Sequence, residues 1–176
     1  MGDIDNLEKR PFAWDLLGDI ELGRGALGSE MPVVLYRLLQ FTLMDVLSEN
    51  FGLKKANSFF RDAGYIAGKE FAENAINTNL PLNEFMEHLK NTLASLKMGV
   101  LHMEHFDADS GEIILSVAED LDCSGLPTTG EAVCVYDEGL LAGLLHVYTG
   151  KKYNVQEIDC WATGDSLCRF RGVVQD

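Results

Sequence analysis

The sequence predicts an α+β fold in which an antiparallel sheet packs against a layer of helices. Three observations lead to this prediction. Apolar residues recur at helical spacing through much of the first half of the chain, and the second half contains two segments with the composition of β-hairpins. A further helical segment separates these two hairpins. The order of helices, hairpin, helix and hairpin favours antiparallel pairing over a doubly wound parallel sheet.

The first half of the chain is expected to contain a lead-in and three helices. Residues 1–32 mix charges with glycines and show no sustained period, which predicts an N-terminal arm or an irregular lead-in. A single domain then spans residues 33–176. Its helices are expected at residues 33–49, at about 54–77 and from about 81 to 96. The first of these is apolar on more than one face, so it needs cover from the core and from a second subunit.

The hydrophobic period changes at residue 98, where the predicted sheet begins. The remaining elements are expected as a hairpin, a loop, a helix with a left-handed glycine cap and a second hairpin. In chain order they occupy residues 98–107 with 112–117, residues 121–130, residues 131–148 with Gly150, and residues 151–158 with 167–174.

Composition and charge exclude several classes of protein. The chain has 176 residues, of which 47% are hydrophobic and 24% charged, so it can bury a core without disulfide bonds. Twenty-eight acidic residues against fourteen basic ones give a formal net charge of −14. Such a chain repels nucleic acids and anionic membranes. Its apolar stretches fall short of a bilayer span and its N-terminus does not resemble a signal peptide, so we expect a cytoplasmic protein with reduced cysteines.

Three cysteines and a glutamate form a candidate metal site. Cys160 and Cys168 flank the tip of the last predicted hairpin, and Glu157 lies three residues before Cys160. Cys134 falls in the first turn of the last predicted helix, where the helix dipole favours a thiolate. Three thiolates and one carboxylate can complete a tetrahedral zinc shell. Buried cysteines beside a surface carboxylate are the alternative.

The region that carries these cysteines resembles the 4-vinyl reductase domain family. The resemblance rests on the Glu-Ala-Val-Cys stretch at 131–134, on the glycines at 139, 143 and 150, and on the Glu-x-x-Cys, Gly-Asp and Cys pattern at 157–168. That family includes the aromatic-sensing domains of phenol- and xylene-responsive transcription activators and is similar in fold to small subunits of the transport-particle tethering complex. The resemblance therefore implies a nitric-oxide-signalling/Golgi-transport ligand-binding-like fold.

The resemblance also implies a structural zinc held by Cys134, Glu157, Cys160 and Cys168. Cys123 has no counterpart among these ligands, so we expect an ordinary thiol in a Ser/Gly loop. Replacement of Glu157 as a metal ligand, and covalent reaction with a cofactor, are the alternatives for Cys123. Gly139 and Gly143 are expected to let their helix pack closely onto the sheet.

A cavity between the helices and the sheet, which the resemblance implies, would bind an apolar or aromatic small molecule. The candidate lining residues are Phe59, Tyr65, Phe71, Phe85, Leu89, His102, Met103 and Glu104. Ordinary core positions are the alternative for the apolar members, and a partly exposed strand histidine is the alternative for His102. Neither the histidine nor the tryptophan that orients the hydroxyl group in the phenol sensors has a counterpart here, so the sequence does not predict phenol itself.

These observations favour a non-catalytic sensor or carrier domain over an enzyme. The domain is expected to form a homodimer and to act on a separate effector protein. A tetrapyrrole-processing enzyme of the vinyl reductase type, or its accessory subunit, is one alternative. It would need a nicotinamide or flavin site, and the sequence offers no such motif in the right context. A dimeric scaffold subunit of the tethering type is the other alternative.

Overall fold

The computed structural model describes residues 11–175, and these residues fall into two compact units. The first unit ends at Glu30 and the second begins at Met31. Within the described part of the first unit lie a short 3-10 helix, η2 (Trp14–Leu17), and a four-residue helix, α1 (Ile20–Gly23). The Asp19 side chain caps α1 by accepting a hydrogen bond from the backbone N–H of Leu22 at 2.8 Å.

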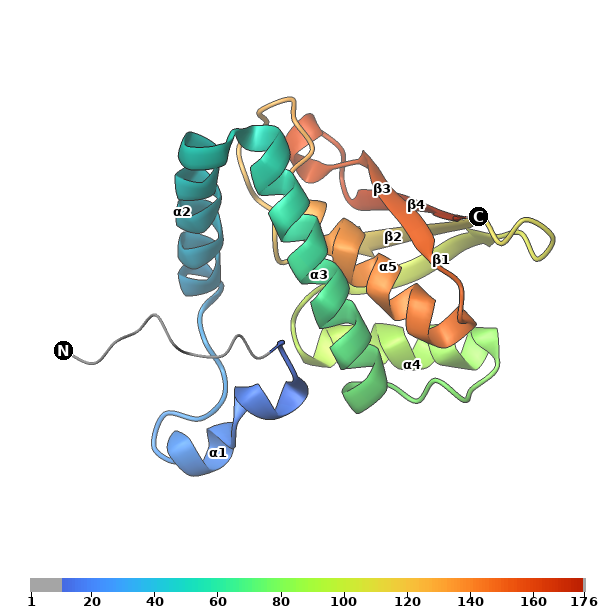
Figure 1. Ribbon diagram of the computed structural model, residues 1–176, viewed down its shortest axis with the longest axis horizontal. Helices are drawn as coiled ribbons and strands as arrows, with labels where there is room; N and C mark the ends of the chain where they lie inside the picture. Colours follow the sequence, from blue (N-terminus) through green and yellow to red (C-terminus); the bar gives the residue numbers. More distant parts are fainter. Residues whose placement is uncertain (1–10, 176) are drawn as a thin grey trace. The chain divides into compact units, whose positions relative to one another are not determined.

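The second unit has the predicted order of elements, which confirms the α+β fold. Three helices come first, a hairpin follows, and one long helix separates this hairpin from the second (Figure 1). The elements are α2 (Val33–Phe51), α3 (Leu53–Ala75), α4 (Leu82–Ser95), β1 (Val100–Phe106), β2 (Ile113–Ala118), α5 (Val135–Thr149), β3 (Tyr153–Asp159), η3 (Trp161–Thr163) and β4 (Cys168–Val174). No helix among residues 11–175 combines the length and the apolar character needed to cross a membrane.

The four strands form one antiparallel sheet in the order β1-β2-β4-β3. Leu115 on β2 pairs with Met103 on β1 and with Phe170 on β4, so these three side chains share one face. Phe170 pairs in turn with Glu157 on β3, which places the Glu157 carboxyl group on the same inner face. The opposite face carries ion pairs, including one from Arg169 to Glu104 at 2.8 Å.

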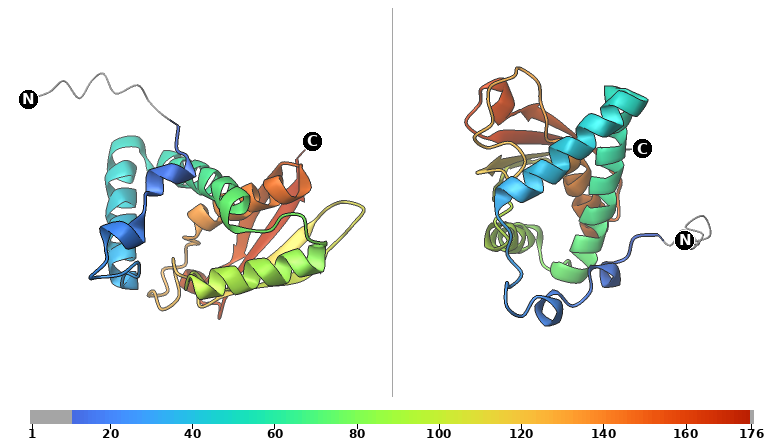
Figure 2. Two further views of the ribbon diagram at one scale, coloured as in Figure 1. Left: turned by 90° about the horizontal axis from the view of Figure 1, so that it is seen from below. Right: turned by 90° about the vertical axis from the view of Figure 1, so that its left-hand side faces the viewer.

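Helices cover the inner face of the sheet in two layers. α4 contacts β1 and α5 contacts β3, while α3 packs against α5 (Figures 1 and 2). The rings of Phe85 on α4 and Tyr148 on α5 stack with their centroids 3.8 Å apart. The core therefore lies between the sheet and the α4–α5 layer.

α3 and α5 contact each other through glycine. A Cβ atom added to Gly139 on α5 would lie 2.0 Å from the carbonyl oxygen of Arg61, and one added to Gly68 on α3 would lie 2.1 Å from that of Leu140. Gly64 and Gly143 meet backbone atoms at similar distances. The expectation that the α5 glycines pack onto the sheet is therefore wrong, because the glycines of α3 allow the two helix backbones to touch instead.

α2 differs from the other long helices because none of its described residues is buried. It joins α3 at Gly52, which has a φ of 80°, a value that favours glycine. The rings of Phe51 and Phe59 meet edge to face across this junction with centroids 5.6 Å apart. Most of the apolar side chains of α2 remain exposed, including Leu39 at 67%.

Candidate functional site

Four cysteine thiols converge at one end of the sheet. Cys123 comes from the loop after β2, Cys134 caps the N-terminus of α5, Cys160 follows β3 and Cys168 begins β4. The four Sγ atoms lie within 4.8 Å of one another, and each residue is fully buried. The Sγ–Sγ distances include 3.0 Å between Cys123 and Cys168, 3.8 Å between Cys134 and Cys168, and 4.0 Å between Cys134 and Cys160. All four cysteines are free.

The donor set fits a thiophilic metal ion such as zinc. Tetrahedral zinc with bonds of about 2.3 Å to four sulfurs separates those sulfurs by about 3.8 Å, and the distances in the cluster bracket this value. The thiol of Cys123, followed by those of Cys160 and Cys168, raises the pKa of Cys134. A bound dication would offset this mutual repulsion between thiolates. Four protein ligands also leave no coordination position for a substrate, as expected of a structural site.

Glu157 lies beside the cysteine cluster. Its Oε2 atom accepts a hydrogen bond from the backbone N–H of Cys134 at 3.1 Å. Its Oε1 atom is buried without a hydrogen-bond partner among the described residues. Burial, and then the Cys160 thiol, raises the pKa of Glu157 to about 8. The structure thus brings together three of the four predicted ligands, adds Cys123 to them, and places Glu157 at the backbone of one ligand.

The Cys123 thiol reaches the cluster because the preceding turn is held by an aspartate. Asp120 Oδ1 accepts hydrogen bonds from the backbone N–H of Asp122 at 2.8 Å and of Cys123 at 3.1 Å. The same oxygen lies 3.9 Å from the Sγ atom of Cys134. Asp120 therefore fixes the path of the chain at the cysteine whose role the sequence left open.

α2 holds this loop from the other side by hydrogen bonds. Arg37 donates from Nε to the carbonyl oxygen of Leu121 at 2.8 Å and from Nη2 to that of Ser124 at 2.9 Å. Tyr36 donates its hydroxyl proton to Asp122 Oδ1 at 2.7 Å, and Gln40 donates from Nε2 to Asp122 Oδ2 at 2.8 Å. The position of α2 and the position of the Cys123 loop are consequently linked.

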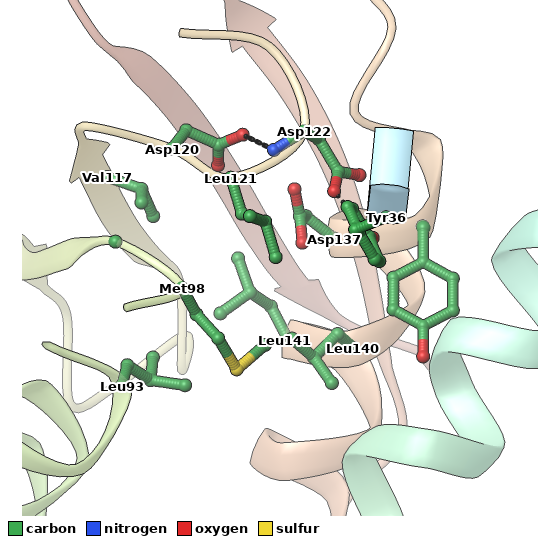
Figure 3. Close-up of a pocket in the computed structure, with 12 residues that line it drawn as sticks. Tyr36, Leu93, Met98, Val117, Asp120, Leu121, Asp122, Asp137, Leu140 and Leu141 are labelled. Carbon is green, nitrogen blue, oxygen red and sulfur yellow. Dashed lines mark hydrogen bonds between the residues drawn. The ribbon is translucent and has the colours of Figure 1, made fainter. Parts of the chain in front are cut away.

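A small cavity lies next to the cysteine cluster. Its volume is about 30 Å³, which is room for water but too little for an aromatic ring. Figure 3 shows carboxyl groups toward one end of this cavity and apolar side chains toward the other. Its lining residues are Tyr36, Leu93, Met98, Gly99, Val117, Asp120, Leu121, Asp122, Tyr136, Asp137, Leu140 and Leu141. We call it the α2 cavity, because Tyr36 of α2 forms part of its wall.

Asp137 is the unusual member of this wall. Its Oδ2 atom is buried, and no described residue donates a hydrogen bond to it. Burial raises the pKa of the Asp137 carboxyl well above its ordinary value, and the charges of Asp122 and Asp120 raise it further. Asp137 lies in the first turn of α5, three residues after Cys134.

The structure does not bring the predicted ligand-binding residues together around the α2 cavity. Phe71, Phe85 and Leu89 belong to the core. Phe59 contacts Phe51, and Tyr65 hydrogen-bonds to His146 on the α3–α5 surface. On β1 the side chains of His102 and Glu104 are exposed, because Leu101 and Met103 occupy the side toward the helices. None of the eight residues, all of which the structure describes, lines this cavity.

Sequence reasoning missed Tyr36 and the three aspartates of this wall. One signal was available, because Asp120 and Asp122 immediately precede Cys123, and Asp137 closely follows Cys134. Acidic residues that neighbour these cysteines in the sequence must also lie near the cysteine cluster in space. Tyr36 carries no comparable signal, since its place depends on how α2 folds back onto the loop.

The fold and the buried thiol cluster define a class, that of small α+β domains in which an antiparallel sheet is covered by helices and carries a cysteine cluster at one end. Residues 113–174 match the family model of the 4-vinyl reductase domain. This match confirms the resemblance found in the sequence, and it covers the segment from β2 to β4.

Two curated relatives are similar to this chain in sequence. Two uncharacterized proteins of Methanocaldococcus jannaschii are 27% identical over 112 residues and 28% identical over 144 residues. The matches cover 64% and 82% of this chain, and they span 64% and 78% of the lengths of these relatives.

The three solved structures show the same fold. The phenol-responsive sensory domain of the transcription activator PoxR, solved with phenol, has a TM-score of 0.61 at 15% identity, covering 84% of this chain and 76% of its own. A vinyl-4-reductase family protein of Methanocaldococcus jannaschii has a TM-score of 0.58 at 18% identity, covering 85% of each chain. Subunit 3 of the trafficking protein particle complex of Naegleria fowleri, covalently bound to palmitic acid, has a TM-score of 0.57 at 11% identity, covering 82% of this chain and 98% of its own.

Proposed function

We propose that this protein is a sensor or carrier domain that binds an apolar or aromatic small molecule without transforming it. The observation that carries the proposal is the wall shared by the α2 cavity and the cysteine cluster. The segment from Asp120 to Cys123 and the first turn of α5 contribute to both. A change in the cavity would therefore be transmitted to the loop that α2 holds.

The cysteine cluster would hold a structural zinc ion. Cys123, Cys134, Cys160 and Cys168 supply four thiolates, and the metal would tie the loop after β2 to α5 and to the last hairpin. Zinc contributes folding free energy in small domains, on the order of 10 kcal/mol. One wall of the cavity would thus stay fixed while the α2 wall moves.

The comparisons favour an apolar ligand. The similar PoxR domain was solved with phenol, and the similar trafficking subunit with palmitic acid. In the present chain the far end of the cavity is lined by Leu93, Met98 and Leu141. A ligand of either kind needs more room than about 30 Å³, so binding would require α2 to move away from the loop.

The exposed apolar surface of α2 would carry the signal to a second protein chain. Leu38 is 60% exposed and Val34 is 69% exposed, and both lie on the helix whose Tyr36 lines the cavity. Exposed apolar surface of this extent is typical of an interface. A second copy of this chain would cover it in a homodimer, and a separate effector protein would respond to its rearrangement.

Thermal-shift screening of the full chain with aromatic compounds, tetrapyrroles and fatty acids tests the binding function. A ligand at a hundredfold excess over its Kd stabilises a domain by about 2.7 kcal/mol, so at least one class should raise the Tm in a concentration-dependent way. If no class does so, the binding function is refuted. Turnover of a vinyl tetrapyrrole with NADPH by the purified chain would instead support the enzyme alternative.

A further inference from the structure

The α2 cavity has two chemically different ends. Leu93, Met98 and Leu141 provide apolar surface at one end, whereas Asp120, Asp122 and Asp137 contribute carboxyl groups at the other (Figure 3). Among the described residues that line the cavity, none is a lysine, an arginine or a histidine. The charge at the acidic end is therefore not balanced by a cation within the wall.

Two of the three carboxyl groups already have donors from the chain itself. Asp120 accepts from backbone N–H groups of the following turn, and Asp122 accepts from Tyr36 and Gln40. Asp137 Oδ2 is buried and has no donor among the described residues. A buried carboxylate oxygen without a donor is unfavourable, and a group that supplies both a proton donor and a positive charge removes the penalty.

We propose that the molecule bound in the α2 cavity is an apolar amine, whose body packs on the leucines and whose cationic N–H group donates a hydrogen bond to Asp137. This inference rests on the proposed function and names the chemical class of its ligand. A cation–carboxylate hydrogen bond is about twice as strong as a neutral one. Three neighbouring carboxyl groups disfavour an anionic ligand, and a neutral alcohol leaves their charge unbalanced.

Entry of such a molecule requires movement at Tyr36. The cavity of about 30 Å³ must grow to admit a ring, because an apolar cavity that binds benzene measures about 150 Å³. Tyr36 is the one residue of α2 in the described wall. None of the described residues of α2 is fully buried, and α2 contacts the loop by hydrogen bonds, so its displacement from the loop exposes little apolar core.

Three ligands of matched size and shape test the proposal: 2-phenylethylamine, 2-phenylethanol and phenylacetate. Binding of each to the full chain would be measured by calorimetry at neutral pH, with thermal shift as a second readout. The amine should bind more tightly than the alcohol by about tenfold or more, and the carboxylate should not bind. The same series would be measured with Asp137→Asn and with the control Asp109→Asn, which changes an exposed aspartate in the β1–β2 turn.

Asp137→Asn should fold, because asparagine has the same shape as aspartate and leaves no ionisable group beside Asp122. Its Tm should therefore not fall below that of the parent. The variant should bind the amine no more tightly than the alcohol, whereas Asp109→Asn should behave as the parent does. Both variants remove one acidic residue, so the comparison separates the effect of the Asp137 carboxyl group on amine binding from the effect of the overall negative charge of the protein.

Several outcomes overturn the inference. Equal or tighter binding of the alcohol or the carboxylate to the parent would do so, as would an amine preference that survives in Asp137→Asn. Failure of the amine to bind would also overturn it, while binding of another class in the thermal-shift screen would leave the proposed function intact. A second equivalent of metal that disappears in Asp137→Asn would show instead that Asp137, with Asp120 and Cys134, holds a cation.

Discussion

The Sγ atoms of Cys123 and Cys168 lie 3.0 Å apart, although 45 positions separate the two residues along the chain. Cys123 sits in a loop that α2 holds by hydrogen bonds, and Cys168 begins a central strand of the sheet. Their proximity connects an exposed helix to the middle of the sheet. A metal ion bound between them would make that connection part of the stability of the whole second unit.

The identity of the fourth metal ligand is the first prediction. Cys123→Ser should lose the zinc and lower the Tm markedly, because three thiolates remain in a site shaped for four. Glu157→Gln should keep one zinc per chain, because an amide oxygen can still accept the hydrogen bond from the backbone N–H of Cys134. Elemental analysis of both purified variants would measure this. The sequence-based ligand set, with Glu157 in place of Cys123, predicts the reverse result.

Removal of Cys168 provides the positive control for that pair. Both ligand sets include Cys168, so Cys168→Ser should lose the metal and with it a large part of the free energy of unfolding, since structural zinc contributes on the order of 10 kcal/mol in small domains. If the parent and this variant both contain no metal in elemental analysis, the zinc proposal is refuted.

The second prediction concerns the hydrogen bonds from α2 to the Cys123 loop. Arg37→Ala removes the donors to the carbonyl oxygens of Leu121 and Ser124. We expect faster amide hydrogen exchange in α2 and in the loop, and faster transfer of zinc to a chelator. Lys54→Ala, an exposed change at the start of α3, should leave both rates unaltered. Unchanged exchange and transfer in Arg37→Ala would show that α2 does not hold the loop.

The third prediction concerns the glycine contact between α3 and α5. A Cβ atom at residue 64 would lie 2.1 Å from the carbonyl oxygen of Tyr136, so Gly64→Ala forces the two helices apart. The free energy of unfolding should fall by about 3 kcal/mol, despite the higher helix propensity of alanine. For Ala63→Ser, which adds one atom to an exposed position of the same helix, it should fall by less than about 1 kcal/mol. Urea unfolding would compare the two, and equal losses would contradict the backbone contact.

The fourth prediction is a homodimer formed through α2. Leu39→Glu places a charge in the middle of the exposed apolar face and should convert a dimer into a 19.5 kDa monomer in sedimentation at micromolar concentration. The matched change Leu96→Glu, at an exposed position after α4, should leave the dimer intact. A parent chain that sediments only as the monomer would refute the dimer.

Periodicity was sufficient to predict the fold but not the walls of the site. The helices and hairpins follow from local spacing, so α5 and the last hairpin lie within a few residues of their predicted bounds. Cys134, Cys160 and Cys168 lie at the ends of these elements, so their positions could be predicted as well. The position of the Cys123 thiol depends on a turn that Asp120 stabilises and on hydrogen bonds from α2, a helix more than 80 positions away in the sequence. Such long-range contacts cannot be predicted from the periodicity of the sequence.

The predicted ligand-binding residues illustrate the same limit. Aromatic residues at helical spacing indicate a buried face, and Phe71 and Phe85 are indeed buried. The pattern does not show whether a buried face meets a cavity or another side chain. Phe85 meets Tyr148, whereas the cavity lies beside Leu93, about two helical turns further along α4.

The glycine contact also determines which part of the second unit can move. Because α3 and α5 touch backbone to backbone, neither can slide or rotate without a collision that no side-chain rotamer relieves. The two helices should therefore move as one body, which contacts the sheet through α5. α2 is attached to that body at Gly52, by its packing against α3 and by hydrogen bonds to one loop, so a change of shape in the second unit would be confined most easily to α2, with Gly52 as the pivot.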